Sequence, residues 1–250
     1  MARAAVLGRL SWRLARAVRV VEETPQARTV VLDVPGWPGH VAGQHVDVRL
    51  TAPDGYTATR SYSVANASDG ETVELTVARV PGGEVSTYLT TAMLPGDEVE
   101  VRGPLGGWFV WRPGDPPGPV QLVAGGSGVV PLMSMVRSRA AAGDTAPMRL
   151  LHSVRDADAA LYRDELVLEA GRPGGIRVTW WHTRDASGAR VGRVDAAVVS
   201  RETLAPSSGA TCYVCGPTGF VEQVTDLLVA AGHDSARIRA ERFGPTGGTS

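Results

Sequence analysis

Three side chains of different chemistry stand close together in the stretch RSYSVANAS, residues 60–68. Arg60 supplies a guanidinium, Tyr62 a flat aromatic ring and Ser63 a hydroxyl. Residues two apart on a β-strand project from the same face, so we expect Arg60 and Tyr62 to point the same way. A guanidinium binds phosphate well, and an aromatic ring stacks on another flat ring. Taken singly, Arg60 also fits a surface salt bridge, and Tyr62 also fits an ordinary core position.

Glycine turns lead into predicted helices at two places. The stretch LVAGGSGVVPLMSMV runs from a buried strand through Gly125, Gly126 and Gly128 into a helix. The stretch PGGEVSTYL places Ser86 near the first turn of another helix. Bare backbone amides at the positive end of a helix can bind phosphate. The first turn departs from the G-x-G-x-x-G pattern of dinucleotide sites, because Pro131 stands near the place of the third glycine. Any tight strand-to-helix corner can use such glycines, and the second turn also fits a simple helix cap.

The chain has two cysteines, Cys212 and Cys215, in the stretch TCYVCGPTGF. Their offset of three residues turns the side chains to opposite faces of a strand, and no second pair completes a zinc site. Two thiolates are also too few for an iron–sulfur cluster or a disulfide framework. We therefore expect no metal site, with Cys212 in the core and Cys215 at the carboxyl end of a strand, where parallel sheets bind ligands.

The pattern of apolar residues divides the chain into two halves. Residues 1–111 contain short Val- and Thr-rich segments between Pro, Gly and Asp turns, which predict an antiparallel β-barrel or sandwich. From residue 120 onward, apolar strands alternate with helical segments, which predicts a doubly wound parallel α/β sheet. The Pro-rich stretch at residues 112–119 is typical of a join between domains. We place an antiparallel β-barrel domain at residues 1–115 and an α/β domain at residues 116–250.

Composition narrows the classes of partner. The formal net charge is −1 and no long run of one sign occurs, which argues against nucleic acid or an anionic membrane as the main partner. The Arg-rich segment at residues 1–21 lacks the apolar run of a signal peptide, and no stretch approaches the ~20 apolar residues of a membrane span. We interpret this segment as a first strand with a frayed lead-in, and we expect a cytoplasmic protein.

Several motifs follow one another in the order found in one enzyme family. Across residues 12–243 they are RSYSVA, GGEVSTYL, GPLGGW, AGGSGVVPLMSM, YVCGP and ERF. In this order they resemble the ferredoxin–NADP reductase superfamily, the flavin- and pyridine-nucleotide-binding module also found in oxygenase reductases. The resemblance implies a flavin-binding barrel followed by an NAD(P)-binding α/β domain. It also implies a flavoprotein reductase in which hydride passes from NAD(P)H to the flavin and electrons leave singly.

The resemblance implies flavin contacts in the first half of the chain. Arg60 would contact the flavin pyrophosphate, Tyr62 would stack on the isoalloxazine, and Ser63 would hydrogen-bond near the reactive flavin nitrogen. A second contact to the flavin pyrophosphate is implied for Gly83, Val85 and Ser86.

The second half supplies the residues that the resemblance assigns to the nicotinamide nucleotide and the reaction centre. The nucleotide loop is matched by Gly125, Gly126, Gly128 and Pro131. The segment beside the nicotinamide is matched by Cys215, Gly216 and Pro217, and the C-terminal pair near the flavin by Glu241 and Phe243. Many members end on an aromatic residue, whereas Phe243 is followed by seven more residues. The implied reaction-centre residues are Ser63, Cys215, Glu241 and Phe243.

Loop arginines bear on the choice of nicotinamide nucleotide. Thr183 and Arg184 stand where family members that prefer NADPH carry Ser-Arg, and Arg155 and Arg193 are further candidates for a 2′-phosphate. NADH stays an alternative, because loop arginines are often only solvated and Asp185 is adjacent. We expect FAD rather than FMN, because FMN users of the family usually carry their own iron–sulfur domain.

The expected partner is a ferredoxin or another one-electron acceptor protein, with the chain acting as an oxygenase-reductase component. The expected cofactors are FAD and NADP, or NAD. Two alternatives stay open: a flavin or quinone reductase with a diffusible acceptor, and a non-catalytic nucleotide-binding relay subunit. The family resemblance favours a monomer.

Overall fold

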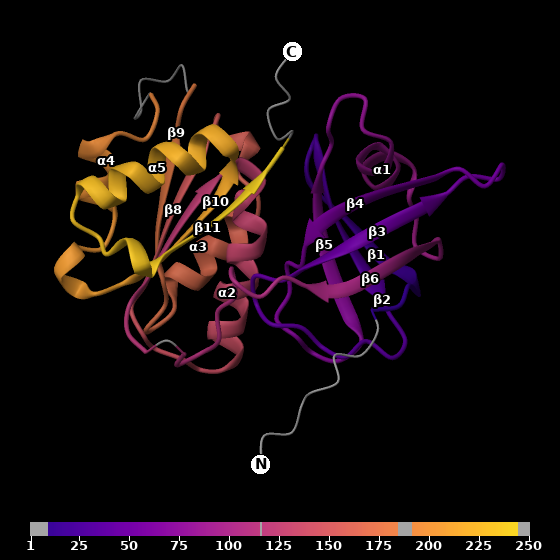
Figure 1. Ribbon diagram of the computed structural model, residues 1–250, viewed down its shortest axis with the longest axis horizontal. Helices are drawn as coiled ribbons and strands as arrows, with labels where there is room; N and C mark the ends of the chain where they lie inside the picture. Colours follow the sequence, from indigo (N-terminus) through magenta and orange to yellow (C-terminus); the bar gives the residue numbers. More distant parts are fainter. Residues whose placement is uncertain (1–9, 116, 185–191, 245–250) are drawn as a thin grey trace.

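The chain forms two bodies that lie side by side, each built on its own β-sheet (Figure 1). The computed structural model describes residues 10–115, 117–184 and 192–244. The first sheet lies within residues 13–105 and the second within residues 120–243. No helix in these described ranges is long and apolar enough to cross a membrane.

The first sheet is antiparallel. Its six strands are β1 (Arg13–Thr24), β2 (Ala27–Asp33), β3 (His45–Thr51), β4 (Thr57–Ser63), β5 (Thr72–Ala78) and β6 (Glu98–Leu105). They lie in the order β4-β3-β6-β1-β2-β5, so β4 and β5 are the outer strands. A bridge between Val64 and Leu75 and a 2.8 Å hydrogen bond from the Ala65 amide to the Glu74 carbonyl join these two strands. These contacts close the sheet into the predicted barrel.

The core of the barrel comes from the inward-facing residues of its strands, which alternate with polar residues along the chain. After β5, the short helix α1 (Glu84–Thr87) and the π-helical turn η1 (Tyr88–Ala92) cross the barrel. Val85 and Leu89 fix these two turns, since each is 1% exposed within the barrel core.

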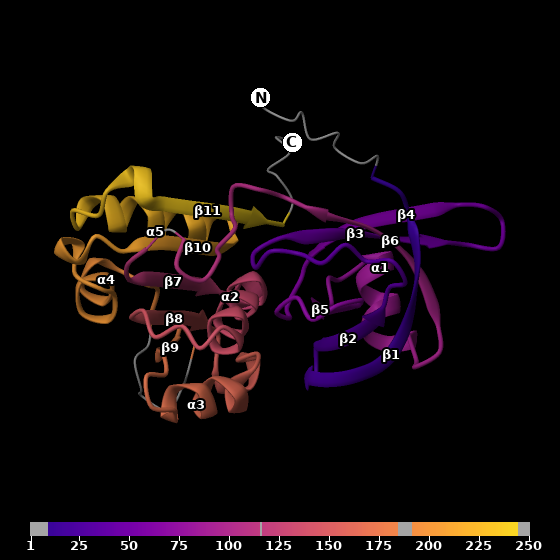
Figure 2. The same ribbon diagram turned by 90° about the horizontal axis from the view of Figure 1, so that it is seen from below.

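The second sheet is parallel and has helices on both faces (Figure 2). Its strands are β7 (Val120–Gly125), β8 (Met148–Val154), β9 (Arg177–His182), β10 (Thr211–Pro217) and β11 (Ile238–Phe243), in the order β11-β10-β7-β8-β9. Its helices are α2 (Val129–Ala141), α3 (Arg163–Gly171), α4 (Ala196–Glu202) and α5 (Thr218–Ala230). Every residue of β7 is buried, as expected for a strand that is covered on both faces. The strand order reverses at β7, and parallel sheets bind ligands at the carboxyl end of such a strand.

Side chains of α2 join the two bodies. The Ser134 hydroxyl donates to the Asn66 carbonyl (2.8 Å), and the Arg137 guanidinium donates to the Glu74 carboxylate (2.9 Å). One buried apolar cluster contains residues of the barrel and residues of α2 and β7. The two bodies therefore share a packed, hydrogen-bonded interface.

The predicted fold class, an antiparallel barrel followed by a doubly wound parallel sheet, is confirmed. The sheets are separated by residues 106–119, which contain the predicted domain boundary, and the boundary itself stays a prediction. The first strand begins at Arg13. The lead-in predicted for residues 1–9 and the C-terminal residues 245–250 lie outside the described ranges.

Candidate functional site

Strand β4 presents Arg60 and Tyr62 on one face, as the sequence predicts. In the β3–β4 pair, Arg60 lies opposite Val48 and Tyr62 lies opposite Val46, and both valines are fully buried. Burial raises the pKa of Tyr62 to about 12, and its ring packs partly against the barrel core. Among the described residues, the Arg60 guanidinium bonds only the Thr59 carbonyl (2.7 Å) and pairs with no carboxylate. Its cation is therefore available to an anion.

Ser63 ends β4 on the other face of the strand. It lies opposite His45, which also pairs with Leu105 at the end of β6. Burial lowers the pKa of His45, so its imidazole is neutral at physiological pH. The sequence alone does not reveal that His45 lies beside Ser63, because this neighbourhood depends on the register of the β3–β4 hairpin.

The glycine turn before α1 is tied by Ser86. The Val80 amide donates to the Ser86 hydroxyl (3.2 Å), which donates to the Gly83 carbonyl (3.3 Å). A Cβ on Gly83 would lie 2.6 Å from that hydroxyl, so a larger residue here would displace the Ser86 side chain from these bonds. No side chain caps α1, which leaves its first amides for another acceptor. Val85 faces the core, so only its backbone can face a ligand.

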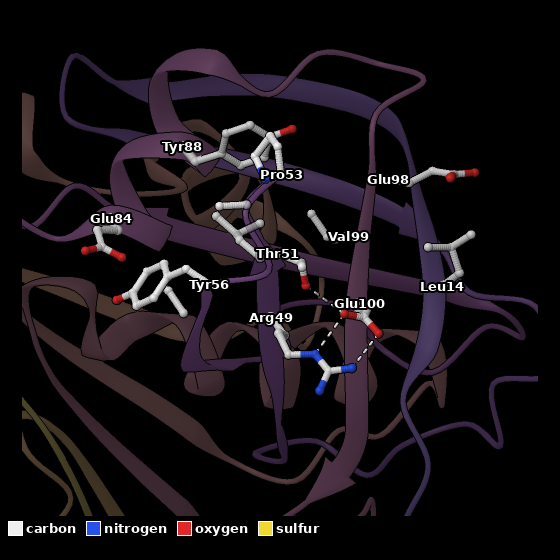
Figure 3. Close-up of a pocket in the computed structure, with 13 residues that line it drawn as sticks. Leu14, Arg49, Thr51, Pro53, Tyr56, Glu84, Tyr88, Glu98, Val99 and Glu100 are labelled. Atoms are coloured by element: carbon white, nitrogen blue, oxygen red, sulfur yellow. Dashed lines mark hydrogen bonds and ion pairs between the residues drawn. The ribbon is translucent and has the colours of Figure 1, made fainter.

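A cavity of 510 Å³ lies at the end of the barrel beside α1 (Figure 3). It starts at Ala58, which shares a face of β4 with Arg60. Tyr56 and Glu84 stand at one side of it, and their hydrogen bond raises the pKa of the Tyr56 phenol. The ion pair of Arg49 with Glu100, which are 2.8 Å apart, borders the other side. Arg60 itself is not among the residues that line this cavity.

The glycine turn after β7 is built for close approach of backbone to backbone. A Cβ on Gly128 would lie 2.1 Å from the Cys215 carbonyl oxygen, and one on Gly125 would lie 2.6 Å from the Phe220 ring. Gly126 adopts a left-handed φ of +54°, which glycine tolerates best. Pro131 is buried in the first turn of α2, where its missing N–H costs no helical bond. The turn thus lies against the YVCGP segment of β10.

A second cavity, of 460 Å³, opens between this turn and the barrel. The predicted residues that line it are Gly126, Arg155, Thr183 and Pro217. The carboxylates of Asp156 and Asp158 line it as well, as do residues 24–27 of the β1–β2 turn.

Two of the predicted phosphate contacts, Arg184 and Arg193, are exposed and do not line this cavity in the described part of the chain. Arg184 stays close, since its amide donates to the Arg155 carbonyl at 2.8 Å. Asp185 lies outside the described residues.

The carboxyl ends of β10 and β11 bring the predicted reaction-centre residues of this half together. Cys215 lies beside Glu241 and Pro217 beside Phe243 in the parallel register, and Gly216 lies between them. Burial raises the pKa of Glu241 to about 7, and burial and the nearby Glu241 raise the pKa of the Cys215 thiol. Phe243 is 37% exposed at the end of β11, which lies beside the barrel in both views (Figures 1 and 2).

The two cysteines lie on opposite faces of β10, as predicted. Cys212 belongs to the buried cluster under α4 and α5, and Cys215 belongs to the cluster under α2. The described residues contain no group of three or more potential metal-ligating side chains.

Comparisons with known proteins identify the two bodies. Residues 20–110 match the oxidoreductase FAD-binding domain, and residues 122–226 match the oxidoreductase NAD-binding domain. The chain is 32% identical over 240 residues to the glycine betaine monooxygenase reductase subunit of Pseudomonas aeruginosa, covering 93% of this chain and 64% of that protein. It is 30% identical over 258 residues to the flavohemoprotein of Bordetella pertussis, covering 96% of this chain and 63% of that protein. The chain thus spans less than two thirds of the length of these relatives.

Solved structures share the fold over nearly the whole chain. A cytochrome P450 reductase from Amycolatopsis is 29% identical with a TM-score of 0.80, covering 97% of this chain and 74% of that one. A ferredoxin NADP+ reductase from Neisseria gonorrhoeae, solved with bound FAD and NADP, is 20% identical with a TM-score of 0.78, covering 92% of this chain and 98% of that one. With an oxidoreductase FAD-binding domain and an oxidoreductase NAD-binding domain matched in this order, the chain belongs to the ferredoxin–NADP reductase superfamily of FAD- and NAD-binding oxidoreductases.

Proposed function

We propose that the chain is an NAD(P)H-dependent flavoprotein reductase that transfers electrons from NAD(P)H, through FAD, to a separate one-electron acceptor protein, as the reductase component of an oxygenase. The observation that carries the proposal is the arrangement of two candidate nucleotide cradles, one on each body, with the end of β11 lying beside the barrel. Relatives and structural neighbours support the acceptor class, because they include a monooxygenase reductase subunit and a cytochrome P450 reductase. The chain has only two cysteines, on opposite faces of one strand, which are too few for an iron–sulfur cluster of its own.

The barrel fits FAD. Arg60 and the uncapped amides of α1 would hold the pyrophosphate, and the Tyr62 ring and the Ser63 hydroxyl would contact the isoalloxazine. Tyr56 and Glu84, in the cavity of Figure 3, would hold the adenosine end. Tyr62 lies six positions after Tyr56, which is about 20 Å of extended chain and matches an extended dinucleotide.

The parallel sheet fits a nicotinamide nucleotide. The turn at Gly126 and Gly128 would take the pyrophosphate, and the 460 Å³ cavity would take the rest of the nucleotide. Arg155 and Thr183 line the cavity and would favour the 2′-phosphate of NADPH, whereas Asp156 and Asp158 would oppose it. The Asp156 carboxylate accepts a hydrogen bond from the Ala159 amide at 3.0 Å. We therefore expect Asp158 to oppose the binding of a 2′-phosphate more strongly than Asp156.

FAD, when bound, supplies the chemistry that accepts a hydride and releases electrons singly. The residues of this chain would orient the two nucleotides, exclude water and hold protons. Glu241 can hold a proton on its carboxyl group at neutral pH, because burial raises its pKa to about 7. Cys215 stays a thiol and packs against Glu241 without carrying charge. Phe243, at the open end of the strand, would cover the reaction centre.

The proposal is tested by a choice of acceptors. The purified FAD-bound protein is mixed with NADPH or NADH and with either a [2Fe–2S] ferredoxin coupled to cytochrome c, free FMN or a quinone. We expect the ferredoxin to accept electrons faster than FMN or the quinone at equal concentration. Equal or faster reduction of FMN or quinone would instead establish a reductase with a diffusible acceptor.

A further inference from the structure

A buried histidine holds the nucleotide turn. His152 of β8 is 0% exposed, and its Nε2 lies 3.0 Å from the Gly126 carbonyl oxygen. Burial lowers the pKa of His152 to about 4, so the imidazole is neutral at physiological pH and carries one N–H. A carbonyl oxygen can only accept, so Nε2 bears that hydrogen and donates it to Gly126.

The other ring nitrogen of His152, Nδ1, makes no polar contact in the described part of the chain that would explain a histidine at this position. Nδ1 is buried and bonds no partner among the described residues. A buried polar atom without a partner destabilises the fold, and a leucine at this position would avoid that cost. The polar contact that explains a histidine here is therefore the bond from Nε2 to Gly126, which is kept although a leucine would be buried at a lower cost.

The direction of the Gly126 carbonyl matters for an anion. Gly126 adopts a left-handed φ of +54° at the point where the chain leaves β7, and its carbonyl oxygen also accepts the amide of Val129. A carbonyl oxygen that faced the cavity would repel a phosphate, whereas amides there attract it. Both bonds keep this oxygen on the buried side, and Gly126 itself lines the cavity.

We propose that His152 is a positioning residue for the nicotinamide nucleotide: its Nε2–H holds the Gly126 carbonyl inside the fold, so that the amides of the turn face the pyrophosphate. The proposal rests on the assignment of this turn to the pyrophosphate. His152 touches no reacting atom, and it acts only through the shape of the turn.

The test measures binding without turnover. Isothermal titration of the FAD-bound protein with NADP+ and NAD+ gives Kd for the wild type, His152→Leu and His152→Gln. Gln can place an amide N–H near the position of Nε2, whereas Leu cannot donate. We expect Leu to raise Kd about tenfold, the loss of roughly one hydrogen bond, and Gln to return it to within about threefold of the wild type. The FAD content of the variants is expected to stay at the wild-type level.

His233→Leu is the matched control. His233 is also buried (6% exposed), but its Nδ1 lies 3.6 Å from the Cys212 sulfur, away from the turn. This variant is expected to keep the wild-type Kd even if its melting temperature falls. Should His152→Leu fail to fold, His152→Asn replaces it, because its shorter side chain cannot bring the amide to Gly126.

Several outcomes would overturn the proposal. One is an unchanged Kd in a folded His152→Leu or His152→Asn protein, and another is a Gln variant as weak as Leu. An equal loss in His233→Leu would reduce the role of His152 to general stability. If the wild type binds neither nucleotide, the assignment of the turn fails together with the proposal, whereas wild-type binding without the expected ranking overturns only the role of His152.

Discussion

The two nucleotide cradles of this molecule are built in different ways. The barrel cradle depends on side chains that project from an outer strand, Arg60 and Tyr62, beside a helix of four residues. The cradle of the parallel sheet depends on backbone, since Gly125 and Gly128 have no room for a Cβ and a helix of 13 residues follows. In a cradle made of side chains, we expect a substitution to weaken nucleotide binding in proportion to the contact it removes. In a cradle made of packed backbone, we expect a single added methyl group to displace the backbone and abolish most of the binding.

The largest effect is expected from Gly128→Ala. The new Cβ would fall 2.1 Å from the Cys215 carbonyl oxygen, which is backbone and cannot move aside without shifting β10. We expect the Kd for NADP+ and NAD+ to rise by roughly a hundredfold. Isothermal titration measures it, with Gly171→Ala as control because a Cβ at Gly171 meets nothing within 4 Å. An affinity equal to that of the control would show that the turn is not the pyrophosphate site.

The corresponding change in the barrel is Arg60→Ala. Arg60 is exposed and pairs with no carboxylate among the described residues, so its loss should leave the fold intact. We expect FAD to bind roughly 10- to 100-fold more weakly, as for the loss of one charge-assisted hydrogen bond.

Fluorescence titration of the apoprotein with FAD measures the effect. Arg172→Ala is the matched control, because that exposed arginine pairs with Glu169 and lines neither cavity. Unchanged FAD affinity in Arg60→Ala would remove the barrel cradle from the account.

Glu241 lies beside Cys215 at the carboxyl ends of β10 and β11, and its burial predicts a pH dependence of stability. Its pKa of about 7 in the folded state lies above the ordinary value of 4.5, so the folded protein keeps a proton that the unfolded chain releases. The wild type should therefore lose about 3 kcal/mol relative to Glu241→Gln as the pH rises from 4.5 to about 7.

Urea unfolding of both proteins across this pH range measures the difference in the free energy of unfolding. Below pH 4.5 the curves of free energy against pH should run parallel, and above about 7 they should run parallel again with the full offset. Curves that stay parallel throughout would mean that Glu241 titrates normally.

The smallest effects are expected at the rim of the nicotinamide cradle. Arg155→Ala should lower the preference for NADPH over NADH by about two- to fivefold, and Asp158→Asn should raise it by a similar factor, because both groups are exposed. Steady-state kcat/KM for the two nucleotides measures the ratio. An unchanged ratio in both variants would move the 2′-phosphate away from this cavity.

Much of the fold could be predicted because its signals are local. The buried run of β7, the alternation in β3 and the turn glycines are readable within ten residues of sequence. The opposite faces of Cys212 and Cys215 follow from the strand period alone. The start of α3 at Arg163 is not readable in this way, because it depends on the left-handed φ of 57° that Tyr162 takes before it.

Parts of the site could not be predicted, because they depend on register and on contacts between distant segments. A slip of one residue would turn His45 away from Ser63, and no local pattern excludes that slip. The bond from His152 to Gly126 joins β8 to the turn after β7 through a buried side chain, and a histidine in an apolar run looks like any core residue. Arg184 and Arg193 were placed by sequence position, which does not reveal which side chains line the cavity.

The central claim, that the two cradles place a nicotinamide nucleotide against FAD, is tested most directly by anaerobic stopped-flow absorbance. The purified, FAD-bound protein is mixed with NADPH and, separately, with NADH, and the flavin band is followed. We expect the flavin band to bleach rapidly with at least one of the two nucleotides. We also expect Gly128→Ala to slow the bleaching at low nucleotide concentration. A protein that holds FAD but is bleached by neither nucleotide would contradict the central claim.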